Sequence, residues 1–430
     1  MPSPSLDRDA ASRRRVLTIA LAYVGFVSLG LPDGLLGVAT PSILRDFALP
    51  PEGIGGLLVA FTAGYLLSSA STGWVLSRMG VGTLLALSCS ATSLSLFGYA
   101  TSPWWSLVLA CGVTSGLGAG AIDAGLNAWV ASRHGARTVN WLHGFYGIGA
   151  TAGPLVMTAV LAEGRPWRTG YALVAAAQLV LAAGFAATRA SWNDAPTAAE
   201  AVRGDALVTT PDEPSDPTSQ PDAAQPTSFA SATAADTLRR PVVWLSVLLF
   251  FLYSGLEAST GLWTYAMLTE SRGVAPSVAG TWVGLFWLGL TAGRFGFGVI
   301  AGRAPLVTLL RASLAAIALG AALIALDLGD AATLAGLVMC GLAMAPIFPT
   351  MIATTPARLG AAHTGNAVGF QIAGATVGTA IVPTLIGFAV GRFGLEAVGP
   401  ALLAGALLLL ALHELVARRE AATRGLQPIG

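Results

Sequence analysis

The chain has 430 residues, of which 54% are apolar and only 10% are charged, and its mean hydropathy is +0.69. This composition excludes an ordinary soluble protein and indicates a chain that resides in a membrane. The formal net charge of +1 provides no basic surface of the kind that binds nucleic acid, so no nucleic-acid partner is expected.

Twelve apolar stretches are each long enough to cross the ~30 Å hydrocarbon layer as a helix of about 20 residues. The first follows three consecutive arginines as a signal peptide would, but its apolar run is too long and lacks a cleavage site, so a retained helix is expected. The twelve stretches are residues 15 to 39, 54 to 76, 80 to 100, 104 to 131, 139 to 162, 168 to 188, 241 to 268, 276 to 302, 304 to 326, 331 to 356, 364 to 390 and 395 to 416.

The positive charges set the expected orientation, and all 23 of them are arginines. If the amino terminus is cytoplasmic, most of these arginines fall on the cytoplasmic side of the spans. Both termini are therefore predicted to be cytoplasmic. The exceptions are Arg294, which lies inside a span, and five arginines on the outer side, namely Arg45, Arg165, Arg168, Arg272 and Arg392.

Residues 190 to 240 interrupt the apolar pattern with six prolines set among alanine, serine, threonine and aspartate. Such a composition buries too little apolar surface to offset the entropy of ordering, so a disordered cytoplasmic linker is predicted. The linker would separate an N-terminal half of six helices, residues 1 to 189, from a C-terminal half of six helices, residues 241 to 430.

The two halves share sequence at matching places. GFYGIGATAG at 144 to 153 matches GFQIAGATVG at 369 to 378 in six of ten positions, a shift of 225 residues that also aligns Arg133 with Arg358 and Phe26 with Phe251. A shift of 229 aligns the TAG at 62 to 64 with the TAG at 291 to 293. We therefore expect an all-α membrane protein with twelve transmembrane helices in two six-helix parallel repeats, which is the major facilitator architecture.

The clear cases of ionisable residues deep within the predicted spans are Asp33, Asp123, Glu257 and Arg294. Each costs about 2.5 to 3.5 kcal/mol on insertion scales, so a function is expected. We interpret the three acids as proton-coupling groups and Arg294 as a substrate contact, with structural ion pairing as the alternative. At about 1.5 Å per residue, Asp33 should lie roughly 9 Å below the outer end of its helix and Asp123 roughly 12 Å above the inner end of its own.

Polar and aromatic residues near these charges are the candidate substrate contacts. Asn127 lies one helical turn from Asp123 and therefore on the same face. Gly112, Gly116 and Gly120 form a neighbouring ridge of small residues that we interpret as helix packing. The expected substrate-binding residues are Asn127, Asn140, His143, Trp263, Trp287, Arg294 and Gln371.

Other kinds of chemistry find little support in the sequence. Histidine and cysteine are too sparse and scattered for a metal site, and no nucleophile has a partnered base. The glycine cluster GLGAGAIDAG lies within a predicted membrane helix with no preceding strand, so it is not a dinucleotide-binding loop. No cofactor, metal or enzymatic activity is expected.

Several motifs in order resemble the fucose permease group of major facilitator sugar symporters, including its sodium-dependent glucose transporter branch. GLGAGAIDAGLNAW (116 to 129), NWLHGFYGIGATAGPL (140 to 155), FLYSGLEASTGLW (251 to 263) and IFPT (347 to 350) are similar to that group's helices 4, 5, 7 and 10. LGLPDGLLGVATP carries an acid where the permeases have one in helix 1.

The resemblance implies that Asp33 is an outer gating and proton-coupling acid and that Asp123 is the central coupling acid. It also implies that Asn127, Asn140 and His143 contact the substrate. His143 stands where the permeases often have glutamine, so the identity of the sugar does not carry over. Ser77 replaces the acid that commonly precedes the arginine between helices 2 and 3.

The expected function is proton-coupled symport of a small polar solute, with a monosaccharide favoured, by a monomer in the bacterial inner membrane. Sodium remains open as the coupling ion. One alternative is a proton-driven exporter of drugs or metabolites. Another, from a different class, is a membrane sensor or scaffold that transports nothing.

Overall fold

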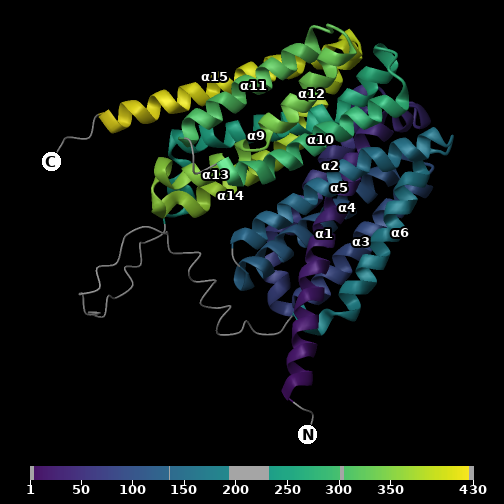
Figure 1. Ribbon diagram of the computed structural model, residues 1–430, viewed down its shortest axis with the longest axis vertical. Helices are drawn as coiled ribbons and strands as arrows, with labels where there is room; N and C mark the ends of the chain where they lie inside the picture. Colours follow the sequence, from purple (N-terminus) through teal and green to yellow (C-terminus); the bar gives the residue numbers. More distant parts are fainter. Residues whose placement is uncertain (1–3, 135, 193–231, 301–304, 426–430) are drawn as a thin grey trace.

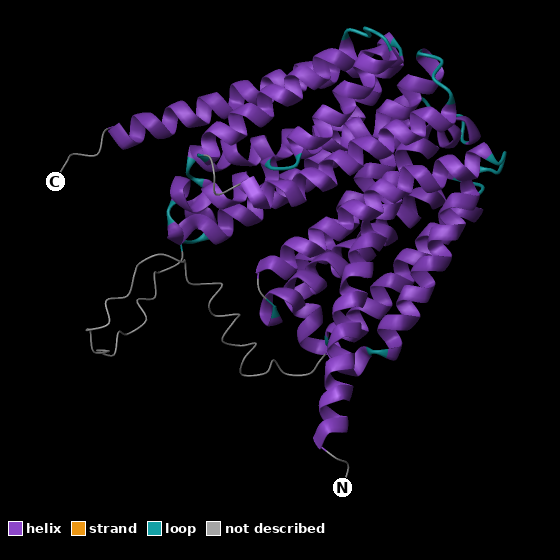
Figure 2. Ribbon diagram, in the orientation of Figure 1, coloured by secondary structure: helices purple, strands orange, loops and turns teal. Residues whose placement is uncertain are grey.

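The computed structural model describes residues 4–134, 136–192, 232–300 and 305–425, and every regular element in these ranges is helical (Figure 2). Eleven helical segments in the described residues are long and apolar enough to cross a membrane. They match eleven of the twelve expected spans. The twelfth, expected at 276 to 302, forms a 25-residue helix that ends beside residues outside the described ranges.

The N-terminal helix group consists of six long helices. α1 packs along α5, α2 packs along α4, and α3 packs against α6 and α4. Two short 3₁₀ turns, η1 (Pro51–Gly53) and η2 (Arg189–Trp192), accompany them. The bounds are α1 (Pro4–Asp46), α2 (Ile54–Met79), α3 (Val81–Thr101), α4 (Trp105–Arg133), α5 (Ala136–Ala162) and α6 (Trp167–Ala187).

The C-terminal helix group repeats this pairing. α9 packs along α14, α10 along α12, and α11 against α15 and α12, so corresponding helices meet in the same order as in the first group. This correspondence confirms two six-helix parallel repeats. The bounds are α8 (Ala234–Leu238), α9 (Pro241–Ala266), the π-helical turn η3 (Met267–Ser271), α10 (Pro276–Ile300), α11 (Leu306–Ala325), α12 (Asp330–Met344), α13 (Ile347–Leu359), α14 (Ala361–Phe393), η4 (Leu395–Ala397) and α15 (Val398–Gly425).

Glycine and proline determine where several helices end. Gly80, between α2 and α3, has φ of 74°, and Gly360, between α13 and α14, has φ of 81°. Residues with a side chain rarely adopt this backbone conformation. α12 and α13 form one span broken at Ala345 and Pro346, because Pro346 and Pro349 lack the N–H groups that would continue the helical hydrogen bonds.

Two boundaries differ from the sequence-based expectation. The first span runs from Val16 to Asp46 rather than from 15 to 39, because the helix continues through Pro41. The predicted linker is also helical at both ends, where η2 buries Trp192 completely and α8 begins at Ala234. Residues 193–231, the greater part of the predicted linker, lie outside the described residues.

The two groups meet more closely at one end than at the other. We call the end that carries Trp192 and Ala232 the linker end, and the opposite end the far end. Figure 1 shows the two groups converging at the far end and diverging toward the linker end. At the far end η1 and the start of α2 pack on α14, and α1 meets α9, whereas α5 and α10 remain in contact along most of their length.

Candidate functional site

Asp33 lies about midway along the first span, between Val16 and Asp46. The predicted depth near the outer end was wrong, because α1 continues beyond residue 39. The Asp33 side chain is exposed, and its Oδ2 accepts a hydrogen bond of 2.7 Å from the hydroxyl of Tyr146 on α5. Close packing of α1 on α5 sets this contact: a β-carbon on Gly30 would collide with the carbonyl oxygen of Tyr146.

Asp123 lies on α4 and is held by two uncharged donors. Its Oδ2 accepts a hydrogen bond of 2.5 Å from the Tyr65 hydroxyl of α2, and its Oδ1 accepts one of 3.0 Å from Asn127 Nδ2. The glycine ridge positions Tyr65, because β-carbons on Gly116 and Gly120 would collide with the backbone of α2. The packing role predicted for this ridge is therefore confirmed.

Glu257 and Arg294 form an ion pair within the C-terminal helix group. Arg294 Nη2 lies 3.6 Å from Glu257 Oε1, and the two side chains are 22% and 15% exposed. The other carboxylate oxygen, Oε2, accepts a hydrogen bond of 2.5 Å from the Tyr253 hydroxyl one turn earlier on α9. This geometry agrees with the ion-pair alternative considered for Arg294.

α5 carries two polar side chains between these groups. His143 is exposed and interacts electrostatically with both Asp123 and Arg294. Tyr146, three residues later, interacts electrostatically with Glu257 and Arg294 in addition to its bond with Asp33. Through α5, the acids of one helix group and the ion pair of the other therefore form a single electrostatic group. Asn140 belongs to α5, but its side chain lies outside the part of the chain that the structure describes.

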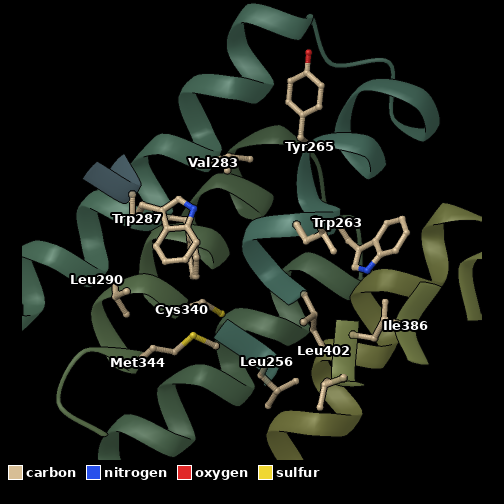
Figure 3. Close-up of a cluster of buried hydrophobic side chains, with 14 of the residues drawn as sticks. Leu256, Trp263, Tyr265, Val283, Trp287, Leu290, Cys340, Met344, Ile386 and Leu402 are labelled. Atoms are coloured by element: carbon tan, nitrogen blue, oxygen red, sulfur yellow. The ribbon is translucent and has the colours of Figure 1, made fainter. Parts of the chain in front are cut away.

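The structure does not bring Trp263, Trp287 or Gln371 to this group. Trp263 is 1% exposed and donates its indole N–H to the carbonyl oxygen of Pro383 at 2.9 Å. Trp287 is 5% exposed and packs against Gly261, and Figure 3 shows both indoles inside the apolar core. Gln371 is 1% exposed and accepts a hydrogen bond from Thr355. Helix packing covers all three side chains in this conformation, so their contact with a solute stays a prediction.

The tyrosines were not among the predicted site residues. Each of the three acids accepts a hydrogen bond from one tyrosine hydroxyl, provided by Tyr146, Tyr65 and Tyr253. Tyr253 precedes Glu257 by one helical turn, a spacing visible in the sequence. Tyr65 and Tyr146 lie on different helices from their acids, so no local signal connects them.

The charges of the site do not balance. Glu257 has Arg294, whereas no arginine within the described ranges lies at ion-pair distance from Asp33 or Asp123. In the described structure, both carboxylates therefore have only uncharged donors at hydrogen-bond distance. Such an arrangement favours the uptake of protons or other cations, because burying an ionised carboxylate without a counter-charge is costly.

The sequence profile of the Major Facilitator Superfamily matches residues 22–370. The chain belongs to this superfamily. The facilitator fold predicted from the repeats is thereby confirmed, and the chain is a multi-pass membrane protein of this superfamily.

Individual relatives of this facilitator are distant. "Bypass of stop codon protein 6" of Saccharomyces cerevisiae is 24% identical over 286 residues, which are 65% of this chain and 56% of the yeast protein. The match thus spans little more than half of that curated relative.

Solved structures share the fold over nearly the whole chain. A mutant of the nucleoside transporter NupG has a TM-score of 0.73 at 12% identity, with 93% of this chain and 99% of that chain covered. A D-xylose-proton symporter has a TM-score of 0.68 at 14% identity, with coverage of 92% and 97%. A bacterial homolog of the human lysosomal transporter Spinster has a TM-score of 0.70 at 13% identity, with coverage of 94% and 97%. At these identities the likeness extends to the fold alone.

Proposed function

We propose that this facilitator is a proton-coupled symporter of a small uncharged polar solute, with a monosaccharide as the favoured substrate. The observation that carries the proposal is the pair of carboxylates, Asp33 and Asp123, each bonded to a tyrosine hydroxyl and neither paired with a cation in the described structure. The fold supplies the alternating access on which such a mechanism depends.

The coupling follows from the cost of burying charge. When the helix groups rock and enclose the site, the two carboxylates lose contact with water. An ionised carboxylate without a counter-charge is expensive in that environment, so each takes up a proton before closure. Opening to the other side restores water and releases the proton. Sodium could play the same part, and the experiment below separates the two ions.

The arrangement of arginines supports an orientation of the protein in the membrane. If the linker end is cytoplasmic, as the positive-inside pattern predicts, the described conformation is closed outside and opens inward. Protons then enter with the solute at the far end and leave at the linker end. Under this proposal both termini lie in the cytoplasm of a bacterial cell, and the transporter resides in the inner membrane.

The polar groups of the site fit a hydroxyl-bearing solute. Asn127, His143 and the tyrosine hydroxyls can each donate or accept hydrogen bonds. The two uncompensated acids disfavour anions such as sugar phosphates. The fold neighbours named for D-xylose-proton symport and nucleoside transport, and the motifs similar to the fucose permease group, support the same class of solute.

The second candidate is a proton-driven exporter of cationic amphipathic compounds. The same two carboxylates favour it, because a permanent positive charge on a solute would compensate them as a proton does. The third hypothesis is that the protein is a membrane sensor or scaffold. It predicts no solute movement at all.

Uptake into proteoliposomes tests these readings. Purified protein is reconstituted and supplied with labelled monosaccharides, with an inward proton gradient, an inward sodium gradient, or neither. Accumulation above the external concentration only with the proton gradient is the expected result. Accumulation with the sodium gradient alone would show that sodium, rather than the proton, is the coupling ion. Gradient-driven movement of an organic cation but no sugar would favour the exporter, and no movement of either would overturn transport.

A further inference from the structure

The hydroxyl of Tyr253 lies between two hydrogen-bond acceptors on different helices. It is 2.5 Å from Glu257 Oε2 on its own helix and 3.0 Å from the carbonyl oxygen of Met344, the last residue of α12. Tyr253 is 1% exposed, so water does not readily substitute for either partner. A phenol carries one proton, and that proton can serve only one of the two acceptors fully.

The protonation state of Glu257 decides which acceptor receives it. An ionised Glu257 accepts the phenol proton, because hydrogen bonds to a charged group are the stronger ones. The Met344 carbonyl oxygen then loses this donor. A protonated Glu257 instead donates its own proton to the Tyr253 oxygen, and the phenol proton turns to Met344. Arg294 lies 3.6 Å from the other carboxylate oxygen, Oε1, and also interacts with the Tyr253 hydroxyl. A guanidinium has no acceptor, so Arg294 does not take the phenol proton from either acceptor.

Met344 stands at the point where its span is broken. α12 ends at Met344, α13 begins at Ile347, and Pro346 between them interrupts the helical hydrogen bonds. α13 continues to Leu359 at the linker end, where it packs on α14. A bond to Met344 therefore stabilises the junction from which the linker-end half of this span projects.

Polar and charged groups on three other helices also act on Glu257. Arg294 faces it from α10, Asp33 interacts with it electrostatically from α1, and the Tyr146 hydroxyl does so from α5. A proton or a solute that changes the charge around Glu257 thus changes which acceptor, Glu257 or the Met344 carbonyl oxygen, receives the Tyr253 proton.

We infer that Tyr253 is a positioning residue that transmits the charge state of Glu257 to the break between α12 and α13. When Glu257 is neutral, Tyr253 holds the end of α12. When Glu257 is ionised, the junction loses that bond and becomes more mobile. The inference goes beyond the proposed function and does not depend on which solute is carried.

Amide hydrogen exchange on the purified protein in lipid nanodiscs tests the inference. Glu257→Gln provides a permanent neutral donor at Oε2, so Tyr253 should bond Met344 continuously. Exchange over residues 345–352 should then slow by roughly threefold to tenfold, the range given by one hydrogen bond of ordinary strength. In the double variant Glu257→Gln with Tyr253→Phe, this slowing should disappear. Tyr99→Phe, which removes a buried hydroxyl on α3, is the matched control and should leave the effect of Glu257→Gln unchanged.

A second measurement keeps the test decisive if the Tyr253 variant fails to fold. In the unaltered protein, exchange over the same residues, corrected for its intrinsic pH dependence, should slow as pH falls. In Glu257→Gln the corrected rate should not vary with pH. The inference is overturned if Glu257→Gln slows exchange equally with and without the Tyr253 hydroxyl, or if the unaltered protein has no corrected pH dependence.

Discussion

Gly37 of α1 and Gly261 of α9 cross so closely that a β-carbon on Gly37 would collide with the carbonyl oxygen of Gly261. This contact joins the two helix groups on the far-end side of the acids. Backbone atoms cannot move aside as a flexible side chain can, so the crossing requires glycine at position 37.

Gly37→Ala should prevent full closure of the far end. The added methyl group holds α1 away from α9, and the population shifts toward a conformation open at the far end. Transport should fall by at least roughly tenfold, the factor that corresponds to about 1.4 kcal/mol. Spin labels at the exposed positions Glu163 and Leu328, both in far-end loops, should report a longer distance between the groups. Gly56→Ala is the control, because its β-carbon would meet only Leu109 at 3.5 Å. An unchanged distance in Gly37→Ala would exclude this crossing as the closure contact.

Asp123→Asn should separate coupling from binding. The amide keeps the shape of the carboxyl group and can still bond Tyr65 and Asn127, but it cannot carry a charge that a proton neutralises. We expect accumulation driven by a pH gradient to be lost, while exchange of internal for external solute persists at least in part. Both activities are measured in the same vesicles. Glu163→Gln alters an exposed acid paired with Arg165 and should change neither activity. If Asp123→Asn still concentrates solute, Asp123 is not the coupling acid.

Paired variants of Glu257 and Arg294 should distinguish a structural ion pair from a substrate contact. Arg294→Gln leaves Glu257 without its cation and should lower stability by about 1 to 3 kcal/mol. Adding Glu257→Gln removes the unpaired charge and should restore stability, as measured by thermal unfolding in detergent. Uptake should remain low in this double variant if Arg294 also contacts the solute. Full recovery of uptake would instead mean that Arg294 serves only to neutralise Glu257.

Arg272→Gln should destabilise the C-terminal helix group at its far end. The Arg272 side chain is 6% exposed, pairs with Glu396 at 2.7 Å and Asp327 at 3.2 Å, and donates to the carbonyl oxygen of Ile324. It thereby ties together three connections between helices. Arg272 is buried but both acidic partners are about half exposed, so a loss of about 1 to 3 kcal/mol and a measurable fall in unfolding temperature are expected. Arg165→Gln, which removes a pair exposed by more than half, should cost less than about 1 kcal/mol. Equal effects of the two substitutions would contradict the assignment.

Much of the architecture followed from local sequence. A membrane span is a run of apolar residues, and its length and hydropathy are properties of that run alone, so eleven of the expected spans could be located without tertiary information. The close approach of some neighbouring helix to α4 was visible as glycine repeating every four residues, because a ridge of small residues lets two helices pack closely. Only the tertiary structure identified that neighbour as α2. The acids were also identifiable, since a carboxylate inside an apolar run is costly wherever it lies.

Tertiary structure decided how those acids are satisfied and which neighbours they have. Tyr65 reaches Asp123 across 58 positions of sequence, and Tyr146 reaches Asp33 across 113, so neither partnership leaves a local pattern. The repeat shift of 229 residues aligns Tyr65 with Arg294, so related positions in the two groups provide a neutral donor to one acid and a cation to the other. Trp263 and Gln371 could have faced either a solute or a neighbouring helix, because in a nearly uniform apolar helix the amphipathic pattern that would choose between faces is weak. Only the packing of α9 on α14, and of α13 on α14, decided that both are buried.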